Sequence, residues 1–333
     1  MLRGKCFLIP LGMLLFLYGC SDSQGADKPV ADALVIAHRG ASGYLPESTL
    51  PAYVLAYESG ADYLEMDLVM SRDGIPVVFH DLVLDDTTDV AERFPGHVRA
   101  DGRWYVSDFT VAELRQLNVF ERFEGRFPKN VKGYSIPTFE AVLQLVQELN
   151  NLSGCNVGVY PEIKHPKYHL NIGLPMEGVV VNLLEQYGYA SESSRAYLQS
   201  FDKDSLIEIR YALQSELKLI QLVGNGAEYD EMVTEEGLDA VSDYAHGIGP
   251  SKARVFQSDG DLVRDAQRRG LKVHPYTFRA DVVPESAKDF SEELDLFVSR
   301  YGVDGVFTDH SDQVLKNLGR MEQSGGLWNR CRG

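Results

Sequence analysis

The chain has few of the features that mark nucleic-acid-binding, zinc-binding or repeat proteins. Its 333 residues include 32 Lys and Arg against 49 Asp and Glu, and no basic run is interleaved with aromatic residues. The net charge of −17 argues against nucleic acid or an anionic lipid surface as the main partner. No CxxC or HExxH pattern points to zinc, and no internal repeat or low-complexity tract appears. The composition is that of a globular protein with a substantial core.

The beginning of the chain resembles a bacterial lipoprotein signal. Arg3 and Lys5 precede an apolar stretch, 7–18, which is too short for a comfortable membrane span and is soon followed by Cys20. Such a signal peptide (1–19) is cut before Cys20, which is then lipidated, and simple cleavage with free secretion is the alternative. The residue that follows Cys20 is Ser21 and not Asp, which in lipoproteins of this kind predicts sorting to the outer membrane. The sequence therefore predicts an exported, periplasmic protein that contacts a membrane only through a lipid anchor.

Cysteine is scarce, with four residues in the chain. Signal cleavage would remove Cys6 and commit Cys20 to lipid, and removal of residues 1–19 would take the net charge from −17 to −19. Cys155 and Cys331 would remain. In an oxidising compartment they could form a disulfide, and two free or buried thiols are the alternative.

After a short polar tether (20–32), strand-like apolar runs alternate with helical patterns, which is typical of a parallel α/β domain. We expect this domain to cover 33–320, followed by a tail (321–333). Thr49 and Gly60 are expected to bound the first helix, Thr138 to begin another, and Gly270 to end a third. The candidate strands are Leu34–Ala37, Tyr63–Val69, Pro76–Phe79, Val157–Ile163, Ala196–Ser200, Leu217–Leu222, Asp239–Val241, Lys272–Phe278 and Gly305–Thr308.

These nine strands are one more than a (β/α)8 TIM barrel needs. The connection from Met70 to Pro76 is too short for a crossover helix, and it contains Asp73-Gly74, a favoured tight-turn dipeptide. We therefore predict a hairpin over 63–80, which leaves eight strands for the barrel. A turn centred between Asp73 and Gly74 would set His80 opposite Asp67.

Residues 82–136 have few strand signals and many charged and aromatic side chains. One helix is expected over Val111–Leu117, because Thr110 and Glu113 form a capping-box pattern. An insertion at the catalytic end of a barrel often becomes a lid, so we predict a cap over the site. The alternative is a surface segment packed on its own aromatic residues.

Three carboxylates are expected to meet at the C-terminal ends of the strands, where TIM barrels carry their active sites. Glu65 and Asp67 alternate on one strand and therefore share a face, as Glu162 and Lys164 do on another. An all-oxygen cluster suits a hard cation. We expect Ca2+, because it tolerates irregular coordination better than Mg2+, and Mg2+ is the alternative. The alternative is a salt-bridged barrel rim in which Arg39 and Lys164 neutralise the carboxylates.

Basic and aromatic residues accompany these carboxylates. His38 and His80 can divide acid and base duties near neutral pH, although a single histidine at a strand end is more often structural. Arg39 and Lys164 are suited to bind phosphate oxygens. Tyr276 and Phe278 could line an apolar slot for a substrate backbone, and otherwise they are core residues.

From Leu34 to Asp312 the chain resembles the glycerophosphodiester phosphodiesterase family, in particular its exported bacterial type. The resemblance rests on an ordered set of motifs: His38-Arg39-Gly40-Ala41, Pro46-Glu47-Ser48-Thr49, Glu65-Met66-Asp67, Asp73-Gly74, Val78-Phe79-His80-Asp81, Pro161-Glu162-Ile163-Lys164, Tyr276-Thr277-Phe278-Arg279 and Asp304-Gly305-Val306-Phe307-Thr308-Asp309. It implies a metal site at Glu65, Asp67 and Glu162, catalysis by His38 and His80, and phosphate binding by Arg39 and Lys164. The insertion after His80-Asp81 resembles the family's cap.

Two positions depart from the wider family: Ser48 stands where much of the family has Asn, and Tyr276 stands where many members have Trp. These departures put the fine substrate preference in question. Glu47 either binds the metal directly or accepts a hydrogen bond from a residue beside the metal site.

The resemblance implies metal-dependent hydrolysis of glycerophosphodiesters, such as glycerophosphocholine or glycerophosphoethanolamine, to glycerol 3-phosphate and an alcohol. Attack by the neighbouring glycerol hydroxyl through a cyclic phosphate and direct attack by water are both open routes. Alternative functions are a phospholipase C- or D-like activity on intact lipids and a surface lipoprotein with mainly a binding or adhesion role.

Overall fold

The computed structural model describes Met1 and residues 32–129 and 131–320. Residues 2–19 of the expected signal peptide, Cys20, most of the tether and the tail 321–333 lie outside the described residues. Cys155 is disulfide-bonded. Its expected partner, Cys331, lies outside the described residues, so this pairing stays a prediction.

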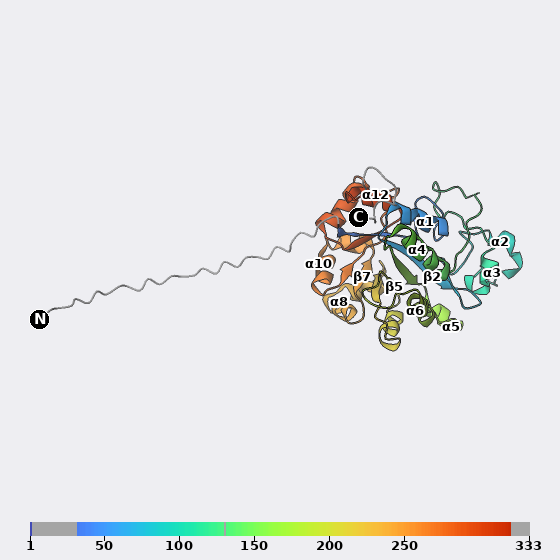
Figure 1. The fold of residues 1–333 in the computed structure, drawn as a ribbon, viewed down its shortest axis with the longest axis horizontal. Coiled ribbons are helices and arrows are strands. Elements are labelled where there is room, and N and C mark those ends of the chain that lie inside the picture. Colours follow the sequence, from blue (N-terminus) through green and yellow to red (C-terminus); the bar gives the residue numbers. More distant parts are fainter. Residues whose placement is uncertain (2–31, 130, 321–333) are drawn as a thin grey trace.

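Eight parallel strands form a nearly closed barrel, as the sequence predicted, in the spatial order β8-β7-β6-β5-β4-β2-β1-β9 (Figure 1). Hydrogen bonds join the two end strands, from the Asp304 N–H to the Val273 carbonyl (2.9 Å) and from the Phe278 N–H to the Phe307 carbonyl (2.8 Å). The strands are β1 (Leu34–Ala37), β2 (Tyr63–Met70), β4 (Gly158–Ile163), β5 (Tyr197–Ser200), β6 (Lys218–Val223), β7 (Gly247–Pro250), β8 (Lys272–Val273) and β9 (Gly305–Thr308).

Helices surround this barrel on its outer face (Figure 1). The helices outside the insertion are α1 (Leu50–Ser59), α4 (Phe139–Ser153), α5 (Pro166–Asn171), α6 (Glu177–Gln186), α7 (Lys203–Ile207), η4 (Glu208–Ala212), η5 (Ala227–Val233), α8 (Glu235–Ser242), α9 (Lys252–Gln257), α10 (Asp261–Arg268), α11 (Phe290–Leu294), η6 (Asp295–Arg300) and α12 (Ser311–Asn317). None of the helices in the described part of the chain combines the length and apolar character needed to cross a bilayer.

The predicted helix boundaries follow from local chemistry. Gly60 takes a left-handed conformation (φ +90°) after α1, where a residue without a Cβ is favoured. The Thr138 side chain accepts the N–H of Ala141 and caps α4. Thr49 also stands at an N-cap, but its hydroxyl donates to the Pro46 carbonyl and does not cap α1.

The strand predicted at Asp239–Val241 was wrong, because these residues belong to α8. Thr234 caps that helix, and Leu238 and Val241 form its buried face. The true seventh strand is β7, whose sequence Gly-Ile-Gly-Pro has poor strand propensity and gave no signal. Its glycines are required by packing, since a Cβ at Gly247 would lie 2.5 Å from the Lys272 carbonyl oxygen.

The hairpin is present, but its register differs by one residue from the prediction. β3 (Pro76–Val78) pairs antiparallel with β2 outside the barrel order, with Leu68 opposite Val78. Ser71 and Ile75 are hydrogen-bonded across the turn, and Gly74 is left-handed (φ +72°). This three-residue loop places Phe79, rather than His80, opposite Asp67, and the Phe79 N–H donates to the Asp67 carbonyl.

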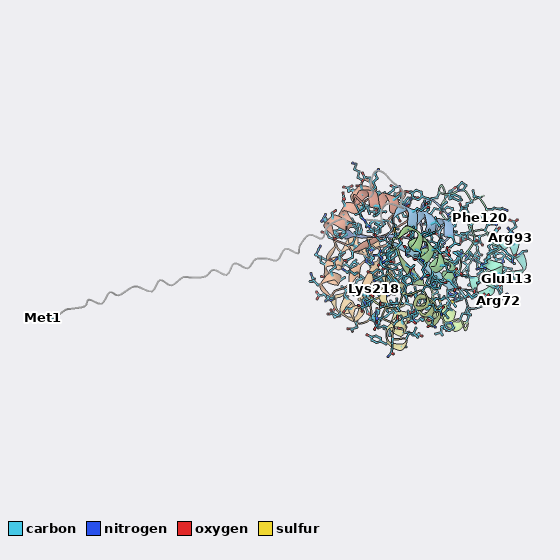
Figure 2. The ribbon with its side chains drawn as sticks, viewed as in Figure 1. Met1, Arg72, Arg93, Glu113, Phe120 and Lys218 are labelled. Atoms are coloured by element: carbon cyan, nitrogen blue, oxygen red, sulfur yellow. The ribbon has the colours of Figure 1, made fainter. Side chains whose placement is uncertain are left out.

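The insertion 82–136 lies to one side of the barrel (Figure 1). Its elements are α2 (Val90–Arg93), η2 (Pro95–His97), η3 (Val106–Asp108) and α3 (Val111–Leu114). The capping box of Thr110 and Glu113 is present, although α3 is shorter than predicted. The buried side chains of the insertion form an apolar cluster with Val69, Val77 and Phe79 of the hairpin. Arg72 of the hairpin turn forms an ion pair with Glu113 (3.0 Å), and Figure 2 shows both residues at this side of the molecule.

Candidate active site

Glu65, Asp67 and Glu162 lie together, as the strand alternation predicted. β2 and β4 are parallel neighbours with Asp67 opposite Glu162. One oxygen from each of the three carboxylates lies within 4.8 Å of the others. All three residues are buried. We call this cluster the carboxylate triad.

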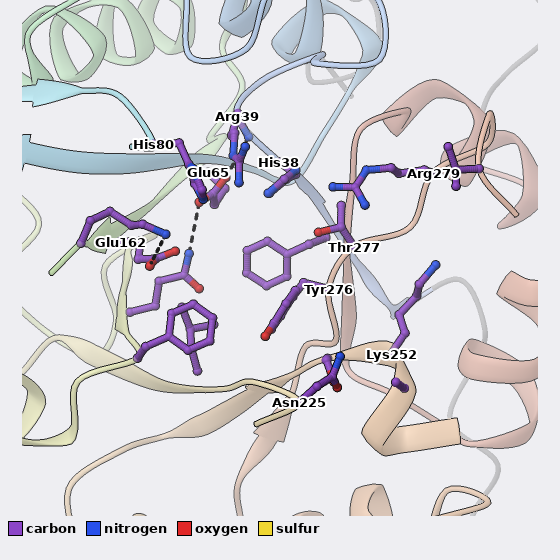
Figure 3. Close-up of a pocket in the computed structure, with 18 of the residues that line it drawn as sticks. His38, Arg39, Glu65, His80, Glu162, Asn225, Lys252, Tyr276, Thr277 and Arg279 are labelled. Carbon is purple, nitrogen blue, oxygen red and sulfur yellow. Dashed lines mark hydrogen bonds and ion pairs between the residues drawn. The ribbon is translucent and has the colours of Figure 1, made fainter. Parts of the chain in front are cut away.

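Two cations contact the triad without neutralising it. Arg39 Nε lies 2.9 Å from Asp67 Oδ2, and Lys164 Nζ lies 3.0 Å from Glu162 Oε1. Among the described residues, Glu65 forms no ion pair. It accepts hydrogen bonds from the Arg39 backbone N–H (2.8 Å) and from the Gln199 side chain (3.3 Å), the latter drawn in Figure 3. The salt-bridged network that the sequence left open as an alternative is therefore present. It has two cations for three carboxylates, so it lacks one positive charge.

The pKa values show the consequence of that shortage. Burial and the neighbouring Asp67 raise the pKa of Glu65 well above its usual range, and the same causes raise that of Glu162 to about 8. At Asp67 burial is outweighed by Arg39 and Lys164, so its pKa is lowered. A divalent cation would relieve the repulsion among these oxygens, and an all-oxygen donor set suits it. The triad could therefore bind a divalent metal ion.

Both histidines border the cavity (Figure 3). Each is held by the carboxylate of an aspartate. His38 follows β1, and its Nδ1 lies 2.7 Å from Asp309 Oδ1. His80 follows β3, and its Nδ1 lies 2.6 Å from Asp81 Oδ1. Ionised carboxylates hold a proton on Nδ1, which leaves Nε2 of each ring as the acid–base atom. Burial lowers the pKa of both histidines, with Arg39 as the next cause, so neutral imidazole is favoured.

The sequence placed Asp309 at the catalytic end of the last strand, but it gave neither Asp309 nor Asp81 a role in the site. Asp309 could have been found from topology, because in a closed barrel the last strand neighbours the first. Ala37 lies opposite Thr308, so His38 and Asp309 follow in register. Asp81 simply follows His80 in the chain.

Glu47 lies beside the triad and not in it. Its carboxylate accepts hydrogen bonds from Arg39 Nη1 (3.0 Å) and Arg122 Nη2 (2.8 Å). Burial would raise its pKa, but Arg39 and Arg122 outweigh burial and lower the pKa to about 2. Of the two roles predicted for Glu47, this geometry supports a hydrogen-bond acceptor beside the metal site and not a metal ligand. Ser48 beside it is left-handed (φ +61°), a conformation that favours Asn among residues with side chains.

The cavity has a volume of about 520 Å3, with the histidines, Arg39 and the triad's two glutamates on one side. Its other side is formed by residues that follow the later strands β6, β7 and β8, including Asn225, Lys252, Tyr276, Thr277 and Arg279 (Figure 3). Phe278, predicted beside Tyr276, packs instead against Phe297 in the core, with ring centroids 5.0 Å apart. Regular pairing of β8 ends at Val273, so the expected alternation of Tyr276 and Phe278 is not maintained.

Comparisons with known proteins agree on one family. The family model described as Glycerophosphoryl diester phosphodiesterase family matches residues 38–313. A glycerophosphodiester phosphodiesterase of Haemophilus influenzae is 35% identical over 93% of this chain and 96% of its own length, and one of Treponema pallidum is 32% identical over 87% and 93%. A Silicibacter pomeroyi structure described as a putative glycerophosphoryl diester phosphodiesterase has a TM-score of 0.69, at 25% identity, covering 86% of this chain and 93% of that one.

Proposed function

The chain belongs to the glycerophosphoryl diester phosphodiesterase family, and we propose that it hydrolyses glycerophosphodiesters to glycerol 3-phosphate and an alcohol. The observation that carries this proposal is the placement of two carboxylate-held histidines beside a buried carboxylate triad in one cavity. Glycerophosphocholine and glycerophosphoethanolamine are the substrates we expect.

Glu65, Asp67 and Glu162 would hold the metal ion, which we propose to be Ca2+. When bound, the ion supplies Lewis-acid stabilisation of the charge that develops on the phosphate. We favour Ca2+ over Mg2+ because Ca2+ tolerates irregular coordination by carboxylate oxygens, whereas Mg2+ demands a near-octahedral set of ligands. Arg39 and Lys164, which already lie against the triad, would bind the phosphate oxygens.

His38 and His80 would act as the acid–base pair. A neutral imidazole can take the proton of the attacking hydroxyl at Nε2, and the other histidine, protonated, can give a proton to the leaving alcohol. The hydroxyl belongs either to the substrate's glycerol, which gives a cyclic phosphate, or to water. A substrate lacking the hydroxyl next to the phosphate-bearing carbon separates these routes, because undiminished turnover would rule out the cyclic one.

Product analysis of the purified protein tests the proposal. We expect glycerol 3-phosphate from glycerophosphocholine and glycerophosphoethanolamine, and at least a 100-fold slower release from His38→Ala and His80→Ala variants that keep the wild-type melting temperature. Release of a hydrolysis product from intact phospholipid vesicles, but not from these soluble diesters, would favour the alternative of a phospholipase C- or D-like activity. No hydrolysis of either would favour the binding role.

We also propose that the protein is an exported lipoprotein anchored through Cys20, on the support of the sequence pattern alone. Globomycin, which blocks cleavage of lipoprotein signals, should cause a longer precursor to accumulate in cells. An unchanged mature size under globomycin would refute the lipid anchor.

A further inference from the structure

We propose that Arg122 and Arg126 of the insertion are positioning residues, each of which fixes one histidine of the site through that histidine's carboxylate partner. This inference rests on the proposed function, because it concerns the two histidines that would carry the chemistry. It gives the insertion a role other than covering the site. Both arginines lie in one short stretch of chain, four residues apart.

Arg122 acts on His80. Its Nη2 lies 2.7 Å from Asp81 Oδ2, while the other oxygen of that carboxylate holds His80 Nδ1 at 2.6 Å. The same Nη2 donates to Glu47 Oε1 at 2.8 Å. Since Glu47 also pairs with Arg39, which contacts Asp67, the contacts continue without interruption from His80 to the triad.

Arg126 acts on His38. Its Nη2 lies 3.0 Å from Asp309 Oδ2, and the other oxygen of Asp309 holds His38 Nδ1 at 2.7 Å. Nε and Nη2 of Arg126 also bind the two carboxylate oxygens of Asp281, which fixes the guanidinium from a second side. The Arg126 side chain is only 5% exposed, so its ion pair with Asp309 is buried and does not lie on the surface.

The two contacts differ in redundancy. Asp309 Oδ2 also accepts a hydrogen bond from Arg279 Nε (2.8 Å), so the carboxylate keeps one cation when Arg126 is removed. Arg122 is the one arginine paired with Asp81 in the described part of the chain. We therefore expect loss of Arg122 to disturb His80 more than loss of Arg126 disturbs His38.

The physical reason is the rotational freedom of a carboxylate. One oxygen holds the histidine ring, and an arginine on the other oxygen prevents the group from turning and keeps it ionised. Without that arginine, the carboxylate and the ring would sample several orientations, and the histidine would less often face the reacting atom. If the arginines merely attach the insertion to the barrel, the histidines would be unaffected by their loss.

Steady-state kinetics on glycerophosphocholine provide the first test. We expect kcat to fall by about 10- to 100-fold in Arg122→Gln and by a few fold in Arg126→Gln, with KM within about twofold of wild type. Arg103→Gln is the matched control, because Arg103 pairs within the insertion with Asp85 (2.9 Å) and should leave both constants unchanged. An Arg122→Gln variant that behaves like Arg103→Gln would overturn the proposal.

A double-mutant cycle and the NMR signals of the histidine rings make the test specific to positioning. Arg122→Gln and Asp81→Asn should be non-additive in kcat, because both act through His80, and independent effects would contradict the proposal. In protein with 15N-labelled histidine, Arg122→Gln should change the ring nitrogen signals of His80 and leave those of His38, with the reverse for Arg126→Gln. Unchanged ring signals would also refute it.

Two further outcomes are distinguishable. If the wild type does not hydrolyse the diester, the proposed function fails, while the ring signals still decide the positioning role. If Arg122→Gln does not fold, Arg122→Lys keeps the charge but loses the second donor, Nε, which holds the guanidinium on Glu47 Oε2 (3.2 Å) while Nη2 contacts Asp81. A folded Arg122→Lys variant with wild-type kcat would overturn the proposal.

Discussion

His38 and Asp309 meet at the C-terminal ends of the neighbouring strands β1 and β9, with Nδ1 and Oδ1 2.7 Å apart, although 271 residues separate them in the chain. Asp309 is almost fully buried, and two arginines contact its other oxygen. Burial would raise its pKa, but the hydrogen bond from His38 and nearby positive charge outweigh burial and lower it. The carboxylate therefore stays ionised and fixes the tautomer of His38.

Replacing that carboxylate should impair catalysis more than folding. In Asp309→Asn we expect kcat to fall by about 100- to 10,000-fold, because an amide can hold the wrong tautomer of His38. Asp312→Asn is the control, since Asp312 pairs with Tyr44 in an exposed hydrogen bond. Rates and circular dichroism of both variants check this expectation, and a kcat of Asp309→Asn within twofold of wild type would contradict it.

The metal-free protein should lose stability as pH rises. Burial, with Asp67, raises the folded-state pKa of Glu162 from 4.5 to about 8. The folded protein therefore binds a proton that the unfolded chain has released, so this contribution is complete below about pH 4.5 and is lost as pH rises through about 8. Melting temperatures measured in EDTA should fall across this range, and less so in Glu162→Gln. Equal slopes for the two proteins would argue against the assignment.

Arg39 should not be replaceable by lysine. Its guanidinium contacts Asp67 through Nε and Glu47 through Nη1, and a single ammonium group cannot reproduce both contacts with a phosphate as well. We expect kcat/KM for glycerophosphocholine to fall by about 10- to 100-fold in Arg39→Lys. Arg72→Lys, in the half-exposed pair with Glu113, should match wild type. Similar kcat/KM values for the two variants would refute a specific role for the guanidinium.

Gly40 is expected to be required by the backbone. It has φ +79°, and a Cβ there would lie 2.7 Å from the Ala52 carbonyl carbon of α1. Gly40→Ala should therefore lower the free energy of unfolding by more than about 2 kcal/mol, from backbone strain and overpacking together. Gly74 has a similar φ of +72° with open space around it, so Gly74→Ala should cost only about 1 kcal/mol. Urea unfolding measures both, and equal losses would contradict the packing argument.

The barrel and the triad were predictable because they depend on local patterns. Alternation on one strand placed Glu65 with Asp67, and the position of catalytic groups at strand ends brought Glu162 to them. β7 was missed because Gly247 and Gly249 are selected by close packing between strands, which leaves no local strand signal. The hairpin register was missed because Asp73-Gly74 suits both a two-residue and a three-residue loop. Gly74 is left-handed here, but Asp73 does not take the left-handed conformation that a two-residue type I′ turn also requires.

The supports of the histidines were harder to predict. Asp309 follows from barrel closure, but the contacts of Arg122 and Arg126 depend on how an irregular insertion folds back on the barrel. No periodicity marks such a segment, and its many charges make any one arginine inconspicuous in the sequence. Tertiary packing alone selects these two.

Calcium titration of the EDTA-treated protein, with binding and hydrolysis of glycerophosphocholine followed on the same sample, tests the account most directly. We expect one equivalent of Ca2+ to bind and to restore activity in parallel, and we expect Glu162→Gln to lose both by at least about 10-fold. Full hydrolysis by thoroughly chelated protein, or calcium binding unchanged in Glu162→Gln, would contradict a metal site at the carboxylate triad.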